Sequence, residues 1–186
     1  MTGGDQVTGT GAAPGPDRVP VADLDRATAA TAASLLRPSC GSARWIERLV
    51  SGRPYGTVPA LVAASDATIA ALGWADIEHA LAAHPRIGGR PEPEGAGEGT
   101  EAAWSRQEQA GAREAPADVQ AGLRAGNAAY EERFGHVFLI CATGMSAASM
   151  LAALQARLGH DPAREREVVR GELMKIVRLR LGKAFT

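Results

Sequence analysis

The spacing of apolar residues along most of this chain is that of amphipathic helices. Apolar side chains recur every three to four residues, which places them on one face of a helix. This spacing predicts helices over 24–36, 45–50, 58–72, 75–83, 105–112, 116–133, 147–158 and from 162 toward the C-terminus. We therefore predict an all-α fold.

Capping residues mark the ends of several of these predicted helices. Asp23 is expected to cap the first helix, which Pro38 ends. Gly159 is typical of a helix C-terminus, and Asp161 followed by Pro162 is typical of the start of the next helix. These signals indicate short connections between neighbouring helices.

One segment does not fit the helical pattern. Residues 137–141, Val-Phe-Leu-Ile-Cys, are β-branched and aromatic and lie between Gly135 and Gly144, which is typical of a buried strand. The sequence offers no second strand to pair with it. Its backbone groups therefore need helix ends, side chains or a ligand as partners. We predict one extended, buried segment near 137–142.

Two stretches lack the apolar residues of a packed core. Residues 1–19 are rich in Gly, Thr, Pro and Ala, so we expect a disordered N-terminal tail. Residues 90–102 are rich in Pro, Gly and Glu and are expected to form a mobile loop. The remaining residues, 20–186, have the length of a single helical domain.

Charge and cysteine content narrow the function classes. The chain has 20 Lys and Arg against 21 Asp and Glu, and this balance argues against binding to nucleic acid or to an anionic membrane. We find no membrane-length apolar run and no secretory signal. Cys40 and Cys141 belong to no Cys/His cluster, so we expect reduced thiols, no metal site and a cytoplasmic protein.

His84 is the first candidate for chemistry. Pro85 disfavours helical geometry in the residue before it, so the helix over 75–83 is expected to end at His84. The helix dipole at that end favours a protonated imidazole, which suits a general acid near neutral pH. The alternative is a histidine that only caps the last carbonyl groups of the helix.

Ser105 and Glu108 form the second candidate. Ser-x-x-Glu is the pattern of a capping box, in which each side chain binds the backbone amide of the other residue. In the functional interpretation the same helix start turns Ser105, Glu108 and the free first-turn amides toward an anionic ligand. The two interpretations compete for the Glu108 side chain, and both place Ser105 at a helix N-terminus.

The segment from Phe138 to Ala142 is the third candidate. By composition it is core, but free amides and carbonyls of an irregular segment could bind the edge of a flat heterocycle. Cys141 could also be a nucleophile with His84 as its base. Its apolar surroundings predict an inert thiol instead.

Other titratable residues carry weaker expectations. Arg170, Arg178 and Arg180 are expected on the exposed face of the last helix, although one could turn inward as an anion clamp. His136 and His160 lie apart from the other candidates in the sequence and are expected to be solvated.

Three motifs in a fixed order resemble one enzyme family. The family's His-Pro-x-Leu/Ile-Gly signature resembles His84-Pro85-Arg86-Ile87-Gly88, and its Ser-x-x-Glu-Gln-x-Gly signature resembles Ser105-x-x-Glu108-Gln109-Ala110-Gly111. Its third block resembles Asn127-x-x-Tyr130-x-x-Arg133-Phe134-Gly135-x-x-Phe138-x-x-Cys141-Ala142. The family is that of 2-oxo-4-hydroxy-4-carboxy-5-ureidoimidazoline (OHCU) decarboxylase, an enzyme of urate breakdown. The resemblance extends from about residue 20 to the end of the chain.

The resemblance implies a helical enzyme, usually a homodimer, that works without a metal or cofactor. It implies decarboxylation of a small-molecule ureidoimidazoline to (S)-allantoin and carbon dioxide, and coupling to hydroxyisourate hydrolase as a further expectation. It implies His84 as the catalytic acid, and we expect Glu108 to orient the substrate beside it. Substrate contacts are expected from these residues: Pro85, Ser105, Arg106, Gln107, Glu108, Gln109, Phe138, Leu139, Ile140, Cys141 and Ala142.

The chain departs from the family pattern at two places. The loop between the first two motifs is longer than usual, and Met145 stands where relatives often have Lys or Arg. Two other functions remain open at this point. One is a helical module that binds purine-like ligands without turnover, and the other is a cofactor-free hydrolase that uses Cys141 and His84.

Overall fold

The all-α prediction is confirmed. The computed structural model describes residues 18–82, 84–88, 100–108 and 115–186. The helices are α1 (Val21–Arg26), α2 (Ala29–Leu36), α3 (Ala43–Ser51), α4 (Val58–Ala71), α5 (Trp74–Leu81), α6 (Thr100–Glu108), α8 (Ala117–Phe134), α9 (Ala147–Arg157) and α10 (Pro162–Ala184). Among the described residues the β-type pairing is a single bridge between Val19 and Phe185.

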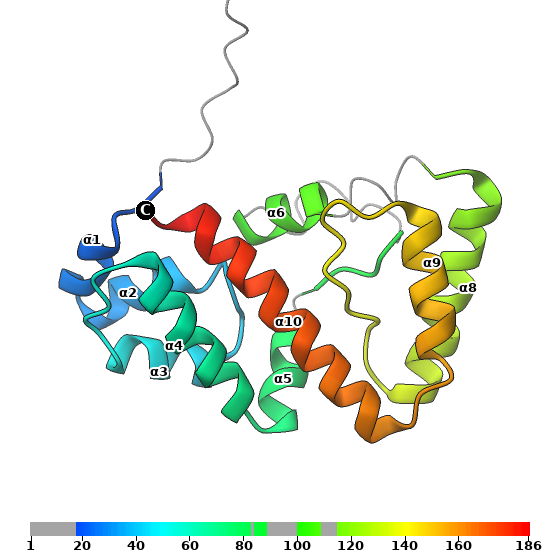
Figure 1. Ribbon diagram of the computed structural model, residues 1–186, viewed down its shortest axis with the longest axis horizontal. Helices are drawn as coiled ribbons and strands as arrows, with labels where there is room; N and C mark the ends of the chain where they lie inside the picture. Colours follow the sequence, from blue (N-terminus) through cyan, green and yellow to red (C-terminus); the bar gives the residue numbers. More distant parts are fainter. Residues whose placement is uncertain (1–17, 83, 89–99, 109–114) are drawn as a thin grey trace, which may run out of the picture.

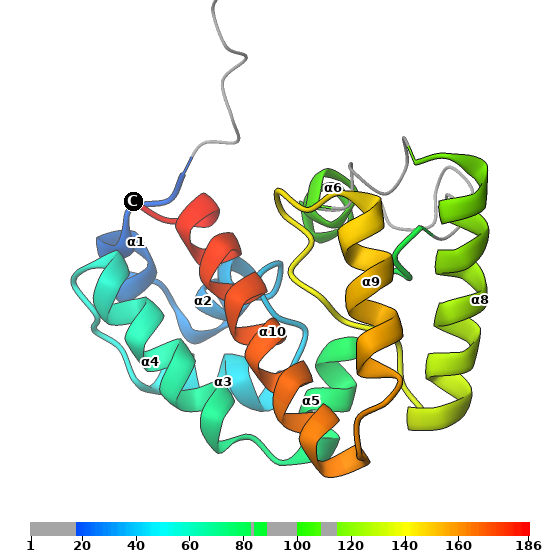
Figure 2. The same ribbon diagram turned by 45° about the vertical axis from the view of Figure 1, so that its right-hand side comes forward.

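Helix α10 crosses the whole molecule and separates two groups of helices (Figures 1 and 2). Helices α1 to α4 lie on one side of α10, and the pair α8 and α9, which run parallel to each other, lies on the other. One buried apolar cluster fills the space between α10 and the first group, around Trp45, Leu61 and Val177. A second cluster, around Leu123 and Met150, lies between α8 and α9.

The predicted extended segment connects these two clusters. Its side chains alternate between them: Leu139 belongs to the first cluster, whereas Phe138 and Ile140 belong to the second. This period of two is that of a β-strand, and the segment lacks helical structure, as predicted. Because the segment has apolar packing on both sides, it reads in the sequence as a continuous run of apolar residues.

Side chains replace the missing partner strand of this segment. Arg157 donates from Nη1 to the carbonyl oxygen of Leu139 at 2.7 Å. The backbone amide of Cys141 donates to Glu172 Oε2 at 2.8 Å. Two backbone groups that a neighbouring strand would bind are therefore satisfied by charged residues of α9 and α10.

The caps of α9 and α10 follow the local sequence. Ser146 accepts from the amide of Ser149 at the start of α9. Asp161 caps α10 as predicted, with its carboxylate accepting from the amides of Ala163 and Arg164.

The prediction of one long first helix is wrong. The chain breaks at Ala27 into α1 and α2, and Thr28 caps α2 by accepting from the amide of Thr31 at 3.2 Å, so Asp23 is not a cap. Arg53 stabilises the break, because its Nη1 atom donates to the carbonyl groups of both Leu24 and Ala27.

The predicted start of the next motif helix is also wrong. Helix α6 is described over Thr100–Glu108, so Ser105 lies within the helix rather than at its start and the capping box does not form. The contacts of the two side chains show the reason. Ser105 and Glu108 are both bound by Arg180 of α10, which outweighs the local capping pattern.

The two ends of the described chain meet. The amide of Val19 donates to the carbonyl of Ala184 at 2.8 Å, and the amide of Thr186 donates to Val19 at 3.0 Å. Residues 1–17 of the predicted tail and residues 89–99, which include most of the predicted loop, lie outside the described residues. Within the described part, no single helix has the length and apolar character needed to cross a membrane, although the bent pair of α4 and α5 has both together.

Candidate active site

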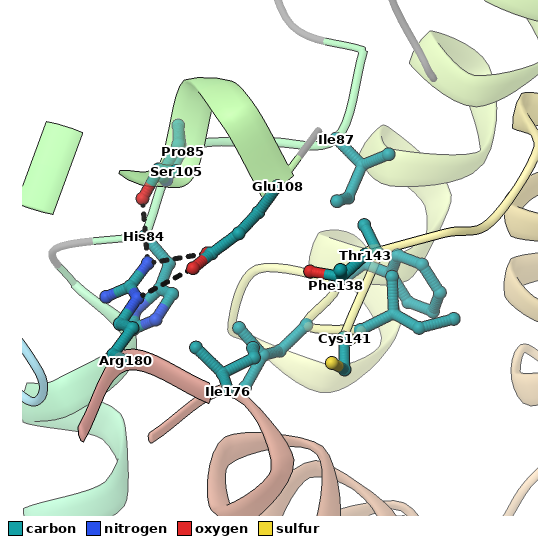
Figure 3. A pocket seen from close by; sticks show the side chains of 13 residues that line it. His84, Pro85, Ile87, Ser105, Glu108, Phe138, Cys141, Thr143, Ile176 and Arg180 are labelled. Atoms are coloured by element: carbon teal, nitrogen blue, oxygen red, sulfur yellow. Dashed lines mark hydrogen bonds and ion pairs between the residues drawn. The ribbon is translucent and has the colours of Figure 1, made fainter. Parts of the chain in front are cut away.

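The three motifs meet at one cavity between α6, α10, the segment after α5 and the extended segment (Figure 3). It encloses about 350 Å³ of empty space, part of it open to solvent. The lining residues are His84, Pro85, Ile87, Ser105, Glu108, Phe138, Leu139, Ile140, Cys141, Ala142, Thr143, Ile176 and Arg180.

His84 lies just beyond the C-terminal end of α5, with its backbone amide bound to the carbonyl of Leu81. Its Nδ1 atom is 2.9 Å from the carbonyl oxygen of Ala80. A carbonyl only accepts, so Nδ1 carries the proton in this contact. The other ring nitrogen, Nε2, then holds a lone pair; it is buried and has no hydrogen-bond partner in the described part of the chain.

The expectation that His84 is protonated in the resting protein is wrong. Burial lowers the pKa of His84 to about 4, and the nearby positive charge of Arg180 acts in the same direction. The contact with Ala80 and the charge of Glu108 favour the protonated form but are the smaller effects. Desolvation thus outweighs the helix dipole, and the imidazole is neutral near pH 7.

Opposite charges meet at the polar wall of the cavity (Figure 3). Arg180 is fully buried, and its Nη2 atom donates to Glu108 Oε2 at 3.0 Å and to Ser105 Oγ at 2.9 Å. Lys183 lies 3.5 Å from Glu108 Oε1, so two cations of α10 contact one carboxylate. The pair Ser105 and Glu108 is therefore held in place by α10, with Glu108 next to the His84 ring.

The opposite wall is apolar and is formed by the extended segment together with Ile87. Asn127 of α8 fixes Ile87, because its Nδ2 atom donates to the Ile87 carbonyl at 2.8 Å. Gly88 follows with a φ of 66°, a left-handed conformation that favours glycine. Arg86 forms a bidentate pair with Glu131 on the outside of the same turn. The His-Pro motif is thus attached to α8 at two points.

Three predicted contact residues are not placed at the cavity. Gln107 is exposed and does not line it. The side chain of Arg106 and the whole of Gln109 lie outside the described residues. Met145 packs at the edge of the second apolar cluster and is absent from the lining, so its uncharged side chain does not alter the cavity wall directly.

The geometry does not favour Cys141 as a nucleophile. Cys141 is a free thiol and lines the cavity. Burial and the charge of Glu172 raise the pKa of the Cys141 thiol, so the reactive thiolate is disfavoured. In Figure 3 the sulfur lies across the cavity from the His84 ring.

The sequence interpretation left Arg180 out of the site. Arg178 is exposed as expected and pairs with Asp66. Arg170 is half-buried and donates to the carbonyls of Ile69 and Leu72, away from the cavity. Arg180 alone of these three turns to the cavity. Its position was a usable signal, since it follows Leu173, Ile176 and Val177 at helical spacing on the buried face of α10.

The described residues contain no group of three His, Cys, Asp or Glu side chains placed to hold a metal ion. The polar side chains that line the cavity are instead an imidazole, a carboxylate, a guanidinium, a thiol and the hydroxyls of Ser105 and Thr143. This set can bind an anionic, hydrogen-bonding ligand and move a proton through His84 Nε2.

Comparison with known proteins finds a family model and relatives that are named for OHCU decarboxylase or for uric acid degradation. A sequence model of the OHCU decarboxylase family matches residues 25–182. The uric acid degradation bifunctional protein TTL of Arabidopsis thaliana is 33% identical over 147 residues, which are 79% of this chain and 45% of the plant protein. The OHCU decarboxylase of Amia calva is 37% identical over 131 residues, 70% of this chain and 74% of that protein.

A solved structure agrees with these relatives. The crystal structure of OHCU decarboxylase in the presence of (S)-allantoin has a TM-score of 0.67 to this chain at 27% identity, and the match covers 79% of this chain and 94% of that one. The chain spans less than half of the bifunctional plant protein but most of the single-function relative and of this structure. This chain therefore belongs to the OHCU decarboxylase family.

Proposed function

We propose that this protein decarboxylates OHCU to (S)-allantoin and carbon dioxide in the breakdown of urate. The observation that carries the proposal is the state of His84: a neutral imidazole whose unpartnered Nε2 atom is buried beside Glu108 and Arg180. Buried polar atoms normally have a hydrogen-bond partner, so a ligand is the natural partner for this one. The membership of the family supplies the identity of that ligand.

The substrate carries its own electron sink. The carbon that bears the carboxylate, C4, adjoins an imine-like carbon, C5. When the bond to the carboxylate carbon breaks, its electron pair forms a double bond between C4 and C5. The imine electrons move to the ring nitrogen, which takes up one proton from solvent. The products are carbon dioxide and an enol.

His84 then moves a proton within the enol. The enol hydroxyl on C4 gives its proton to Nε2, and the resulting imidazolium gives a proton to C5, so that C4 becomes a carbonyl. A neutral resting imidazole fits this order, because it must accept a proton before it acts as the acid. Delivery from one side of the ring sets the configuration of allantoin. Acid–base catalysis of this kind contributes about 10²–10⁴ in rate.

The charged wall orients the substrate in this proposal. Glu108 accepts hydrogen bonds from the substrate hydroxyl and a ring N–H, while Arg180 holds the carboxylate of Glu108 in place. Arg180 and Lys183 also add positive charge close to the site of an anionic substrate. Main-chain groups of the extended segment bind the edge of the ring. Pro85 and Ser105 complete the contacts from the first two motifs.

The wider setting is part of the same proposal. We expect residues 20–186 to act as one domain, in the cytoplasm, as a homodimer and without a metal or cofactor. Functional coupling to a hydroxyisourate hydrolase would supply the short-lived substrate. A relative named as a bifunctional protein of uric acid degradation is consistent with such coupling. Size-exclusion chromatography with light scattering measures the oligomeric state, and activity after chelator treatment tests the cofactor expectation.

The activity test uses substrate made in place from urate with urate oxidase and hydroxyisourate hydrolase. We expect the wild type to accelerate carbon dioxide release in step with loss of OHCU. His84→Asn, which removes the titrating imidazole, should stay folded and lose this acceleration. Folded wild-type protein that binds the compound without speeding carbon dioxide release would contradict the proposal and favour a binding module.

A further inference from the structure

We infer that Arg157 is a positioning residue of this enzyme, which acts through Leu139 and Phe138 to set the orientation of the substrate-lining segment 138–142. The inference rests on the proposed function. Arg157 lies at the C-terminal end of α9, with its side chain 7% exposed, and it is absent from the cavity lining. Its effect on the substrate is therefore indirect.

Arg157 contacts two neighbouring residues of the segment at once. Its Nη1 atom donates to the Leu139 carbonyl at 2.7 Å, and its guanidinium carbon lies 4.5 Å from the centre of the Phe138 ring. A planar guanidinium can hydrogen-bond along its edge while it stacks on an aromatic face. The first contact fixes the direction of a backbone carbonyl, and the second fixes the side chain that precedes it. Together they fix the rotation of the segment about its own axis.

A buried carboxylate holds Arg157 itself. Glu165 of α10 is fully buried and accepts from Arg157 Nε at 2.8 Å. It also accepts from the hydroxyl of Tyr130 on α8 and lies 2.7 Å from Nδ1 of His160. His160, which was expected to be solvated, is thus part of a buried network. Residues of α8, of α9 and of the loop before α10 converge on this one carboxylate of α10, so the position of Arg157 is determined from several sides.

The rotation of the segment decides which backbone groups face the ligand. In an extended chain, successive residues turn their N–H and C=O groups to opposite sides. The Leu139 carbonyl and the Cys141 amide both turn to charged side chains, of Arg157 and Glu172 respectively. By this alternation the amide and carbonyl of Ile140 turn the other way, and among the described residues neither forms a backbone–backbone hydrogen bond. Arg157 therefore leaves these two groups available to bind a ring edge.

The test replaces Arg157 by lysine. Lysine keeps a positive charge beside Glu165, but its ammonium is a point charge and lacks the planar fork that serves Leu139 and Phe138 together. A looser segment lets the substrate ring bind in more than one orientation, so protons reach both faces. We expect Arg157→Lys to raise KM about tenfold and to lower the enantiomeric excess of allantoin, after subtraction of the uncatalysed reaction.

Arg170→Met is the matched control. Arg170 also donates to two main-chain carbonyls, of Ile69 at 2.8 Å and of Leu72 at 2.9 Å, but these lie outside the cavity. We expect it to lower the melting temperature while KM and enantiomeric excess stay at the wild-type values. Loss of folded protein alone lowers apparent kcat and leaves both of those quantities unchanged, so the readouts separate positioning from stability.

Amide hydrogen exchange keeps this test separate from that of the proposed function. We expect Arg157→Lys to speed exchange in residues 137–142, and Arg170→Met to leave those amides unaffected. Should Arg157→Lys not fold, Tyr130→Phe replaces it in the test, because it removes one hydrogen-bond donor to Glu165. We expect it to change KM, enantiomeric excess and amide exchange in the same direction but by less. A folded variant with wild-type KM and enantiomeric excess would overturn the inference. If the wild type itself has no activity, the proposed function fails, and unchanged exchange in 137–142 would overturn the inference independently.

Discussion

The Nδ1 atom of His84 is 2.9 Å from the Ala80 carbonyl, and this contact determines which ring nitrogen can act on a ligand. Because Nδ1 carries the proton, the lone pair is on Nε2, which is buried at the cavity. A residue near the end of α5 thus has both its tautomer and its direction set by its own helix. The contact proposed as a simple cap in the sequence is therefore present, and it prepares the other nitrogen for chemistry.

The lowered pKa of His84 predicts a distinct pH dependence of stability. An unfolded histidine titrates near its ordinary value of 6.5, whereas in the folded protein the pKa of His84 is about 4. Between these values the unfolded chain binds more protons, so the free energy of unfolding falls as the pH falls from 6.5 toward 4. The contribution is up to about 3 kcal/mol. Urea unfolding of the wild type and of His84→Asn at pH 7 and pH 5 measures it. Equal losses in both proteins would contradict the pKa assignment.

Glu108 gives a prediction that separates catalysis from helix capping. A cap alone would cost about 0.5–2 kcal/mol in stability on replacement by alanine, with little change in turnover. Glu108 instead pairs with the buried guanidinium of Arg180, and we expect Glu108→Gln to lower kcat/KM by about 10²-fold. Circular dichroism should show the helical content preserved. Ser105→Ala, which removes the other side chain bound by Arg180, is the comparison and should have the smaller effect.

Glu172 also binds the backbone of the extended segment, through the amide of Cys141. We expect substrate binding to depend on the hydrogen-bond acceptor that Glu172 provides and not on its charge. Glu172→Ala removes the acceptor for the Cys141 amide and should raise KM severalfold. Glu172→Gln keeps an oxygen acceptor but ends the ion pair with Lys175, and it should behave like the wild type. Steady-state kinetics of the two variants decide the question. A glutamine variant as impaired as the alanine variant would show that the charge is what matters.

Close packing of α8 on α9 predicts a stability defect away from the cavity. A Cβ atom added at Gly126 would overlap the side chain of Leu154, which is fully buried. We expect Gly126→Ala to destabilise the fold by about 1–3 kcal/mol, as overpacking of a core does. Thermal unfolding measures this loss. Gly171→Ala is the control, since a Cβ atom there meets open space on α10.

The helices that the sequence predicted well are those whose signals are local. Asp161, Pro162 and the apolar stripe of α10 lie within the element that they specify. The extended segment was also recognisable, because its apolar run is too β-branched for a helix. Its partners were not, since Arg157 and Glu172 reach it from helices that begin after it in the chain.

The sequence prediction included most of the residues that line the cavity, but it omitted Arg180 and did not give the electrostatics of the cavity. The start of α6 was misplaced because the sequence Ser-x-x-Glu is also the pattern of a capping box. In the folded protein Arg180 binds Ser105 instead, and it lies 75 residues away in the sequence. The predicted protonation state of His84 was wrong because it, too, depends on residues that are distant in the sequence. The dipole of α5 can be inferred locally, whereas burial and the charge of Arg180 arise only in the folded chain.

The central claim is that His84 delivers a proton to one face of the intermediate. The most direct measurement follows circular dichroism while urate oxidase and hydroxyisourate hydrolase generate OHCU from urate. With the wild type, the account predicts rapid growth of the (S)-allantoin signal. With folded His84→Asn, it predicts only the slow, racemic decay of the uncatalysed reaction. Rapid formation of one enantiomer by His84→Asn, or racemic allantoin from the folded wild type, would contradict the account.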